Sequence, residues 1–319
     1  MEKTIQSSRS VNAVVLVAAL GYFVDIYDLL LFGIVRVPSL IDLGYEKGSA
    51  LLTEKGEFLI NMQMFGMLVG GILWGVLGDK RGRLSVLFGS IFLYSVANIA
   101  NGMVHSVEAY AIWRFIAGVG LAGELGAGIT LVAEVMPKEK RGVGTMIVAS
   151  VGLTGAVVAN LIYRFTTDWR LCYYIGGGLG LALLLLRIGV SESGMFKTAQ
   201  SENVSRGNFL ALFTNGKRLA KYLRCVLIGM PTWFVIGILV TFAPEFAKAL
   251  GVSGEIKGGD AIMYAYTGIV LGDLATGGLS QLLKSRLRVM FIFLTLSAVS
   301  IGIYLNAYGA SATTFYFLC

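Results

Sequence analysis

Charged side chains stand inside long apolar stretches of this chain. Those deepest in such stretches are Asp25, Asp28, Arg114, Glu124 and Asp273. A charge at the centre of a lipid bilayer costs about 2.5–3.5 kcal/mol on insertion scales, so ionisable residues in apolar spans are candidates for binding or proton transfer. Each can also be one half of a structural pair between two helices.

The first stretch carries two carboxylates close together. Asp25 and Asp28 are three residues apart, so on a helix they share one face. Two neighbouring carboxylates in a medium of low dielectric constant cannot both ionise easily, and one of them tends to hold a proton. We therefore expect one of the two to load and unload a coupling proton.

Asp28 and Arg114 lie at similar depth in their stretches. Asp28 is about seven residues from the outer end of the first stretch and Arg114 about five or six from that of the fourth, so at about 1.5 Å per residue their depths differ by a few ångströms. A pair across the first and fourth helices is therefore geometrically possible. Proton coupling and a purely structural pair are both compatible with this geometry.

The remaining candidates point to a substrate site. Glu124 stands among the glycines of 118–128, where helix backbones can approach closely, and it either lines a cavity or is hydrogen-bonded to a neighbouring helix. Asp273 is the charge deepest in the last third of the chain and is a candidate for a substrate or second proton site. Tyr27 and Trp233 line a cavity or pack between helices.

The composition indicates that the outside of the protein is lipid. Hydrophobic residues make up 56% of the 319 residues and charged residues 14%, whereas a soluble domain averages about 25% charged residues. Apolar runs of about 20 residues can cross the hydrocarbon core as helices. Such runs fall at roughly 11–35, 57–78, 84–104, 108–136, 142–163, 169–190, 223–244, 261–283 and 287–307.

The last apolar run begins near Ala310 and stops at Cys319, at about half the length needed to cross a bilayer. Such a half-span would leave backbone polar groups unsatisfied in lipid. We therefore expect a fragment or a truncated gene product.

Basic residues predict the orientation. Most lysines and arginines occur in one set of loops, including Lys80–Arg83 and 187–224, and loops rich in these residues are cytoplasmic. We expect a multi-pass protein of the cell's inner (plasma) membrane with a cytoplasmic N-terminus. The long inner loop divides the chain into an N-terminal six-helix bundle at 1–190, a cytoplasmic linker at 191–222 and an incomplete C-terminal bundle at 223–319.

Several motifs resemble the major facilitator superfamily. Gly75-x3-Asp79-Lys80-x-Gly82-Arg83 is similar to the loop between the second and third helices of that family. Arg114 through Gly142 resembles the fourth helix and following loop of its sugar-porter-like members. Asp25-Ile-Tyr-Asp28 resembles a motif of the aromatic acid–proton and metabolite–proton symporters, and Ala122-Gly-Glu-Leu-Gly126 resembles the Gly-Gly-Glu stretch of the metabolite–proton group. The seventh stretch, around Met230-Pro231-Thr232-Trp233, lacks the paired glutamines of sugar porters.

This resemblance implies an all-α integral membrane fold of two related helical bundles, with the second bundle incomplete because the last helices are missing. It also implies that Asp28 and Arg114 are the groups on which the coupling proton acts. A charge network at the inner helix ends is implied to control the conformational change. Its members are Asp79, Arg83, Glu134, Arg141 and Glu192.

Other classes of protein fit the sequence poorly. A single histidine and no nucleophile–base set supply little for acid–base or covalent catalysis, so an enzyme is not expected. The net charge of +7 is spread over helix ends rather than gathered on a face, which argues against nucleic-acid binding. The three cysteines lack the spacing of a disulfide or metal site.

We expect a secondary active transporter that takes up a small organic anion, a carboxylate, together with protons, by alternating access. No cofactor or metal is expected, and the protein should act as a monomer in the lipid bilayer. The alternatives are a sugar or polyol transporter, and a non-transporting or truncated transporter-like protein.

Overall fold

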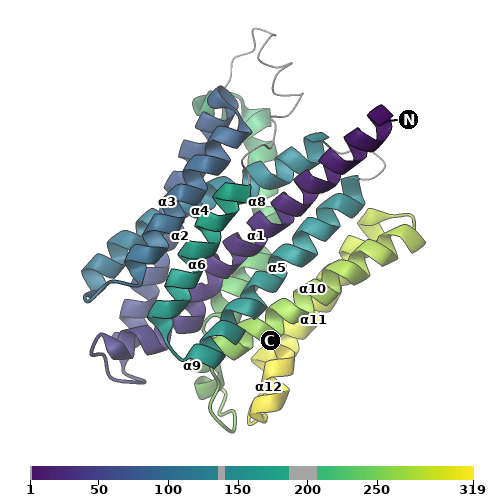
Figure 1. The fold of residues 1–319 in the computed structure, drawn as a ribbon. Coiled ribbons are helices and arrows are strands. Elements are labelled where there is room, and N and C mark those ends of the chain that lie inside the picture. Colours follow the sequence, from purple (N-terminus) through teal and green to yellow (C-terminus); the bar gives the residue numbers. More distant parts are fainter. Residues whose placement is uncertain (1, 136–140, 187–206) are drawn as a thin grey trace. The chain divides into compact units, whose positions relative to one another are not determined.

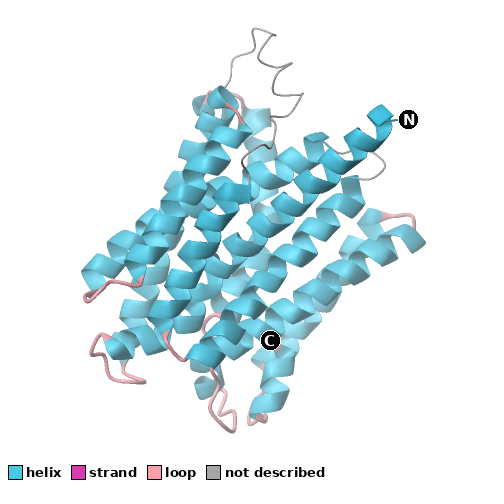
Figure 2. Ribbon diagram, viewed as in Figure 1, coloured by secondary structure: helices cyan, strands magenta, loops and turns pink. Residues whose placement is uncertain are grey.

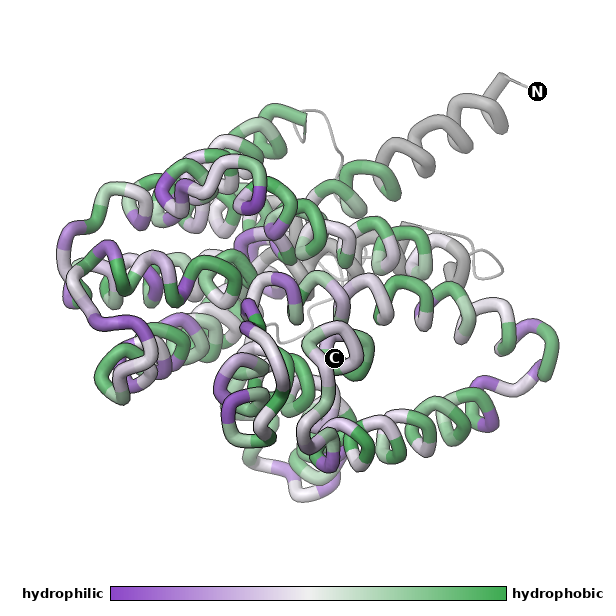
Figure 3. The backbone as a smooth tube through the Cα atoms, turned by 90° about the horizontal axis from the view of Figure 1, so that it is seen from below, coloured by the Kyte–Doolittle hydropathy of each residue, from purple (hydrophilic) through white to green (hydrophobic). Residues whose placement is uncertain are grey.

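The computed structural model describes residues 2–135, 141–186 and 207–319, and in these ranges the chain is built of helices joined by short turns (Figures 1 and 2). Hydrophobic residues run along the helices, and strongly hydrophilic ones gather mainly in the turns (Figure 3). The prediction of an all-α integral membrane protein is confirmed.

The chain divides into two compact units, Met1–Phe209 and Leu210–Cys319. The described helices of the first unit are α1 (Glu2–Asp42), α2 (Ala50–Arg81), α3 (Arg83–Asn101), α4 (Val107–Val135), α5 (Arg141–Thr166) and α6 (Trp169–Leu186). After a single 3₁₀ turn (Phe209–Leu212), those of the second are α8 (Gly216–Phe234), the π-helical segment η2 (Val235–Val240), α9 (Ala243–Ala249), α10 (Gly258–Leu282), α11 (Arg286–Leu305) and α12 (Ala312–Leu318).

Six helical segments in the described ranges are long and apolar enough to cross a membrane. They are Val15–Asp42, Ala50–Arg81, Gly144–Thr166, Trp169–Leu186, Gly216–Val240 and Arg286–Leu305. The spans expected at 84–104, 108–136 and 261–283 are helical as α3, α4 and α10, but their described residues do not reach the same length or hydropathy. Helices also extend past the predicted limits, since α1 has 41 residues.

Side chains and glycines fix the helix ends. Ser49 accepts a hydrogen bond from the Leu52 backbone N–H at 3.1 Å and so caps α2. Gly82 alone separates α2 from α3; its φ of 97° lies in the left-handed region that glycine adopts without steric cost. The Asp168 carboxylate accepts the backbone N–H of Arg170 at 2.8 Å and starts α6.

Glycines bring α2 and α4 into backbone contact. A Cβ at Gly66 would meet the carbonyl oxygen of Phe115, and one at Gly70 would meet that of Val119. The Trp74 indole N–H donates to the same Val119 carbonyl at 2.6 Å. Small residues allow this close approach, and it holds the two helices at a fixed register.

Helix α1 is packed in a similar way on its other side. Gly155 of α5 lies against the backbone carbonyl of Phe23, and Gly176 of α6 lies against the Asp28 carboxylate. Gly180, one turn further along α6, lies against the Ser95 hydroxyl of α3. The first unit therefore places α1, α3 and α6 around one junction, with Asp28 inside it.

The second unit contains a break in its first long helix. Pro231 lies inside α8 and removes one helical hydrogen bond, because proline has no backbone N–H. The π-helical segment Val235–Val240 follows, and its Leu239 carbonyl accepts a hydrogen bond from the Tyr304 hydroxyl of α11 at 2.8 Å. Side-chain bonds from neighbouring helices commonly satisfy backbone groups freed in this way.

The backbone contact between α2 and α4 gives a direct test. Gly70→Ala would push a methyl group into the Val119 carbonyl, and we expect the protein to lose about 1–3 kcal/mol of stability, as overpacked cores do. Gly71→Ala and Gly75→Ala are matched controls, because nothing lies within 4 Å of a Cβ at either position. Thermal unfolding in detergent measures the three variants, and equal melting temperatures would contradict the packing described.

Candidate functional site

The buried guanidinium of Arg114 is the centre of the first unit. Arg114 on α4 is 0% exposed. Its Nη2 donates to Oε1 of Gln63 on α2, and its Nη1 donates to the Tyr173 hydroxyl of α6 at 3.4 Å. The ring of Phe32 on α1 lies 5.0 Å from the guanidinium carbon. These three partners are neutral, and the Arg114 Nε has no hydrogen-bond partner among the described residues.

Aromatic side chains extend this cluster. The Tyr173 hydroxyl shares a 2.7 Å hydrogen bond with the Tyr110 hydroxyl. The Tyr110 ring packs edge-on against Phe32 at 5.4 Å and stacks on Trp169 at 5.8 Å. These rings exclude water from the guanidinium, and their faces also attract a cation.

Asp28 is the carboxylate that faces this cation. It is 0% exposed on α1, and the charged Arg114 and the amide of Asn98 on α3 both interact with it. Neither carboxylate oxygen accepts a hydrogen bond from a described residue. A buried carboxylate is tolerated as an anion only near a compensating charge, and here Arg114 provides it from another helix.

Two further predicted residues of α1 are buried beside this pair. Asp25 is 4% exposed, one helical turn before Asp28. Tyr27 is 0% exposed, and its hydroxyl donates to the Cys172 carbonyl of α6 at 2.9 Å. The phenol of Tyr27 is thus bonded to the α6 backbone in this conformation.

The other predicted residues are spread over the chain. Trp233, 46% exposed on α8, and the half-buried Asp273 on α10 belong to the second unit. Glu124 lies on α4, but its side chain is outside the described part of the structure. In the expected gating network Asp79 is exposed near the end of α2, whereas the side chains of the other four members are not described: Arg83, Glu134, Arg141 and Glu192.

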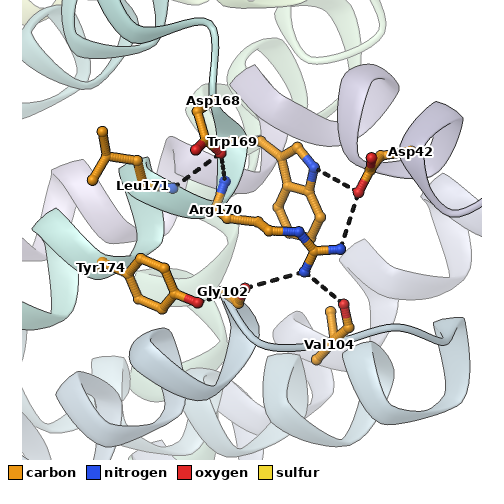
Figure 4. Close-up of polar contacts among 8 residues, drawn as sticks. All are labelled: Asp42, Gly102, Val104, Asp168, Trp169, Arg170, Leu171 and Tyr174. Atoms are coloured by element: carbon orange, nitrogen blue, oxygen red, sulfur yellow. Dashed lines mark hydrogen bonds and ion pairs between the residues drawn. The ribbon is translucent and has the colours of Figure 1, made fainter.

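A second polar cluster ties helix ends together (Figure 4). The Arg170 guanidinium forms an ion pair with Asp42 at 3.0 Å and donates to the carbonyls of Gly102 at 3.1 Å and Val104 at 2.7 Å. The Trp169 indole N–H donates to the same Asp42 carboxylate at 3.3 Å. An exposed ion pair contributes little by itself, but Arg170 also satisfies carbonyls at the end of α3. The cluster therefore joins α1, the α3–α4 turn and α6.

The helices and the buried charges together define a polytopic membrane protein in which Asp28 and Arg114, both 0% exposed, lie inside the first unit. The chain belongs to the Major Facilitator Superfamily, whose sequence model matches residues 18–319.

Relatives with known names support this membership. A Haemophilus influenzae protein named for metabolite transport is 29% identical over 247 residues, which are 74% of this chain and 59% of that protein. The sialic acid transporter NanX of Escherichia coli is 26% identical over 235 residues, covering 72% of this chain and 56% of its own length. The chain thus spans little more than half the length of these relatives, which are transport proteins rather than enzymes.

The fold is also that of a solved member. The proton:xylose symporter XylE, bound to 6-bromo-6-deoxy-D-glucose, aligns with 86% of this chain and 70% of its own, with a TM-score of 0.65 and 18% sequence identity. This likeness shows the fold and the presence of two related bundles, as the sequence predicts.

Sequence reasoning did not single out three residues that surround the charges: Gln63, Tyr110 and Tyr173. Gln63 is a neutral polar side chain within an apolar span, and this position could have marked it as a candidate site residue. Tyrosine is common at membrane interfaces for anchoring, so nothing in the sequence separated Tyr173 from an interfacial residue.

Gln63 provides the test of this geometry. Gln63→Leu removes the acceptor for Arg114 and leaves a buried charged donor unpaired, which should cost about 1–3 kcal/mol of stability. Asn61→Leu is the control, because Asn61 is exposed on the same helix. Chemical or thermal unfolding in detergent compares the two variants, and a Gln63→Leu protein as stable as the wild type would contradict the assigned contact.

Proposed function

We propose that this protein is a secondary active transporter that takes up a small organic anion, a carboxylate, together with protons. The observation that carries the proposal is the state of Arg114. Its guanidinium is buried, its hydrogen-bond partners among the described residues are neutral, and the carboxylate that balances its charge lies on another helix.

The chemistry of the pair supports coupling. Arginine presents several N–H donors in a planar fork that suits a carboxylate. While Asp28 is an anion, it balances the charge of Arg114. A proton on Asp28 would cancel that balance and leave Arg114 as an uncompensated cation, which then favours binding of a substrate carboxylate. Proton and anion would thus bind together.

The remaining proposals complete the cycle. Asp25 is the second carboxylate of the proton site. Tyr27, Glu124, Trp233 and Asp273 are the further substrate-binding residues that we propose, and transport proceeds by alternating access. Asp79 and the other four residues of the inner charge network would bias the conformational equilibrium rather than binding. We place the protein in the inner membrane as a monomer.

The relatives are consistent with this substrate class. Sialic acid, named for NanX, is itself a carboxylate, and a site built on a buried arginine fits such a group. A neutral sugar or polyol is the competing substrate class.

The decisive experiment is proton-coupled uptake by the purified chain in liposomes that contain a pH-sensitive dye. Sialic acid, nicotinate and benzoate are added outside one at a time, followed by xylose and glycerol. We expect the lumen to acidify with at least one carboxylate. Asp28→Asn and Arg114→Gln should each lower the initial rate at least tenfold, equivalent to about 1.4 kcal/mol. Glu108→Gln, an exposed carboxylate at the start of α4, should retain the wild-type rate.

Other outcomes decide against the proposal. Acidification with xylose or glycerol alone would establish the sugar or polyol alternative. Substrate entry without acidification would remove proton coupling. Silence with every compound, from protein that unfolds cooperatively, would favour a non-transporting chain.

Orientation is tested separately. His105 is exposed in the α3–α4 turn, which the positive-inside rule places outside the cell. In a chain without its three native cysteines, His105→Cys should react with an impermeant maleimide in intact cells, whereas Ser8→Cys should react only after the membrane is opened. The opposite pattern would reverse the proposed orientation.

A further inference from the structure

The side of Asp28 that faces α3 and α6 has polar neighbours of its own. Asn98 and Ser95 on α3 are three residues apart and both 0% exposed, so they share one face of that helix. On α6, a Cβ at Gly176 would meet the Asp28 carboxylate, and a Cβ at the adjacent Gly177 would meet the backbone and side chain of the Ser95–Ile99 turn. Consecutive residues of α6 thus bring Asp28 and Asn98 to the same level of the bundle.

Both groups have unused hydrogen-bonding capacity. The two carboxylate oxygens of Asp28 and both polar atoms of the Asn98 amide are buried with no hydrogen bond to a described residue. Neither side chain is exposed to solvent. A buried polar group left without a hydrogen bond is unfavourable, and the Asn98 amide is a side-chain hydrogen-bonding neighbour of the Asp28 carboxyl.

The two partners of Asp28 differ in chemistry. Arg114 carries only N–H donors, so it can bond the charged carboxylate but cannot accept a hydrogen bond from a protonated one. The Asn98 amide has an N–H₂ donor and a carbonyl acceptor. It can therefore donate to the carboxylate and, after protonation, accept from the carboxyl O–H.

We propose that Asn98 is a positioning residue that holds Asp28 while Asp28 carries a proton, and that Arg114 holds it while it is charged. The inference rests on the proposed function, in which Asp28 takes up the coupling proton. Protonation converts the carboxylate into a hydrogen-bond donor, the bond forms to the Asn98 carbonyl oxygen, and Arg114 is released for the substrate anion. Deprotonation reverses both changes.

Among the described residues, the charged and titratable groups around Asp28 come from three helices. Arg114 faces it from α4 and the Tyr173 hydroxyl from α6, and Tyr27 precedes it on α1. Asp25 lies one turn away on the same helix. The Asn98 substitution below changes none of these groups.

Infrared spectroscopy detects whether a protonated carboxyl group is hydrogen-bonded, and the measurement needs no substrate. Difference spectra between acidic and alkaline buffer are recorded on the full chain in lipid, and the C=O stretching band of Asp28 is the band lost in Asp28→Asn. Removal of a hydrogen bond raises the frequency of such a band. We expect Asn98→Leu, which has nearly the same shape, to move the band to higher wavenumber.

Asn101→Leu is the matched control, because Asn101 is equally buried on α3, one turn further along, and should leave the band unmoved. Asn98→Ser is the second variant if Asn98→Leu does not fold, and the band should move in the same direction. An unmoved band in the Asn98 variant, an equal movement in Asn101→Leu, or no Asp28 band at all would overturn the inference.

The spectroscopic and transport results separate the two proposals. A shifted band in a chain that transports none of the compounds would leave Asn98 as the partner of Asp28 and remove the proposed function. Proton-coupled uptake together with an unmoved band would do the reverse.

Discussion

The helices of the first unit pack around the buried guanidinium of Arg114. A buried charge is tolerated only where hydrogen bonds and an opposing charge replace the lost hydration. Arg114 obtains its hydrogen bonds from Gln63 and Tyr173 and a ring face from Phe32, while the opposing charge remains on Asp28. Helices α1, α2 and α6 therefore all contact a single side chain of α4, and moving any of them changes the environment of Arg114.

Close backbone packing makes this arrangement possible. Helices in lipid gain little from the hydrophobic effect, so they associate through van der Waals contact between small residues and through hydrogen bonds. The glycine contacts of α2 with α4, and of α1 with α5 and α6, leave short distances over which side chains such as Gln63 reach the next helix. The polar contacts between the helices thus depend on the close approach that the glycines allow.

The sequence predicted much of this, for identifiable reasons. Apolar length alone located the helices, and the cost of charge in lipid singled out Asp28 and Arg114. Neutral polar residues such as Gln63 and Asn98 carry no charge, so a search for ionisable groups passes over them, and their positions became informative only once the packing was known. The glycines show the same limit, because Gly70 meets a backbone carbonyl while Gly75, in the same sequence pattern, meets nothing within 4 Å.

The glycine contact between α2 and α4 has a mechanical consequence. Sliding α2 along α4 would separate the Val119 carbonyl from both Gly70 and the Trp74 indole. The two helices are therefore expected to move together. Gln63 and Arg114 lie on this pair of helices, whereas Asp28 lies on α1, which packs against α5 and α6. The distance between the two opposite charges therefore changes whenever the α2–α4 pair shifts against α1.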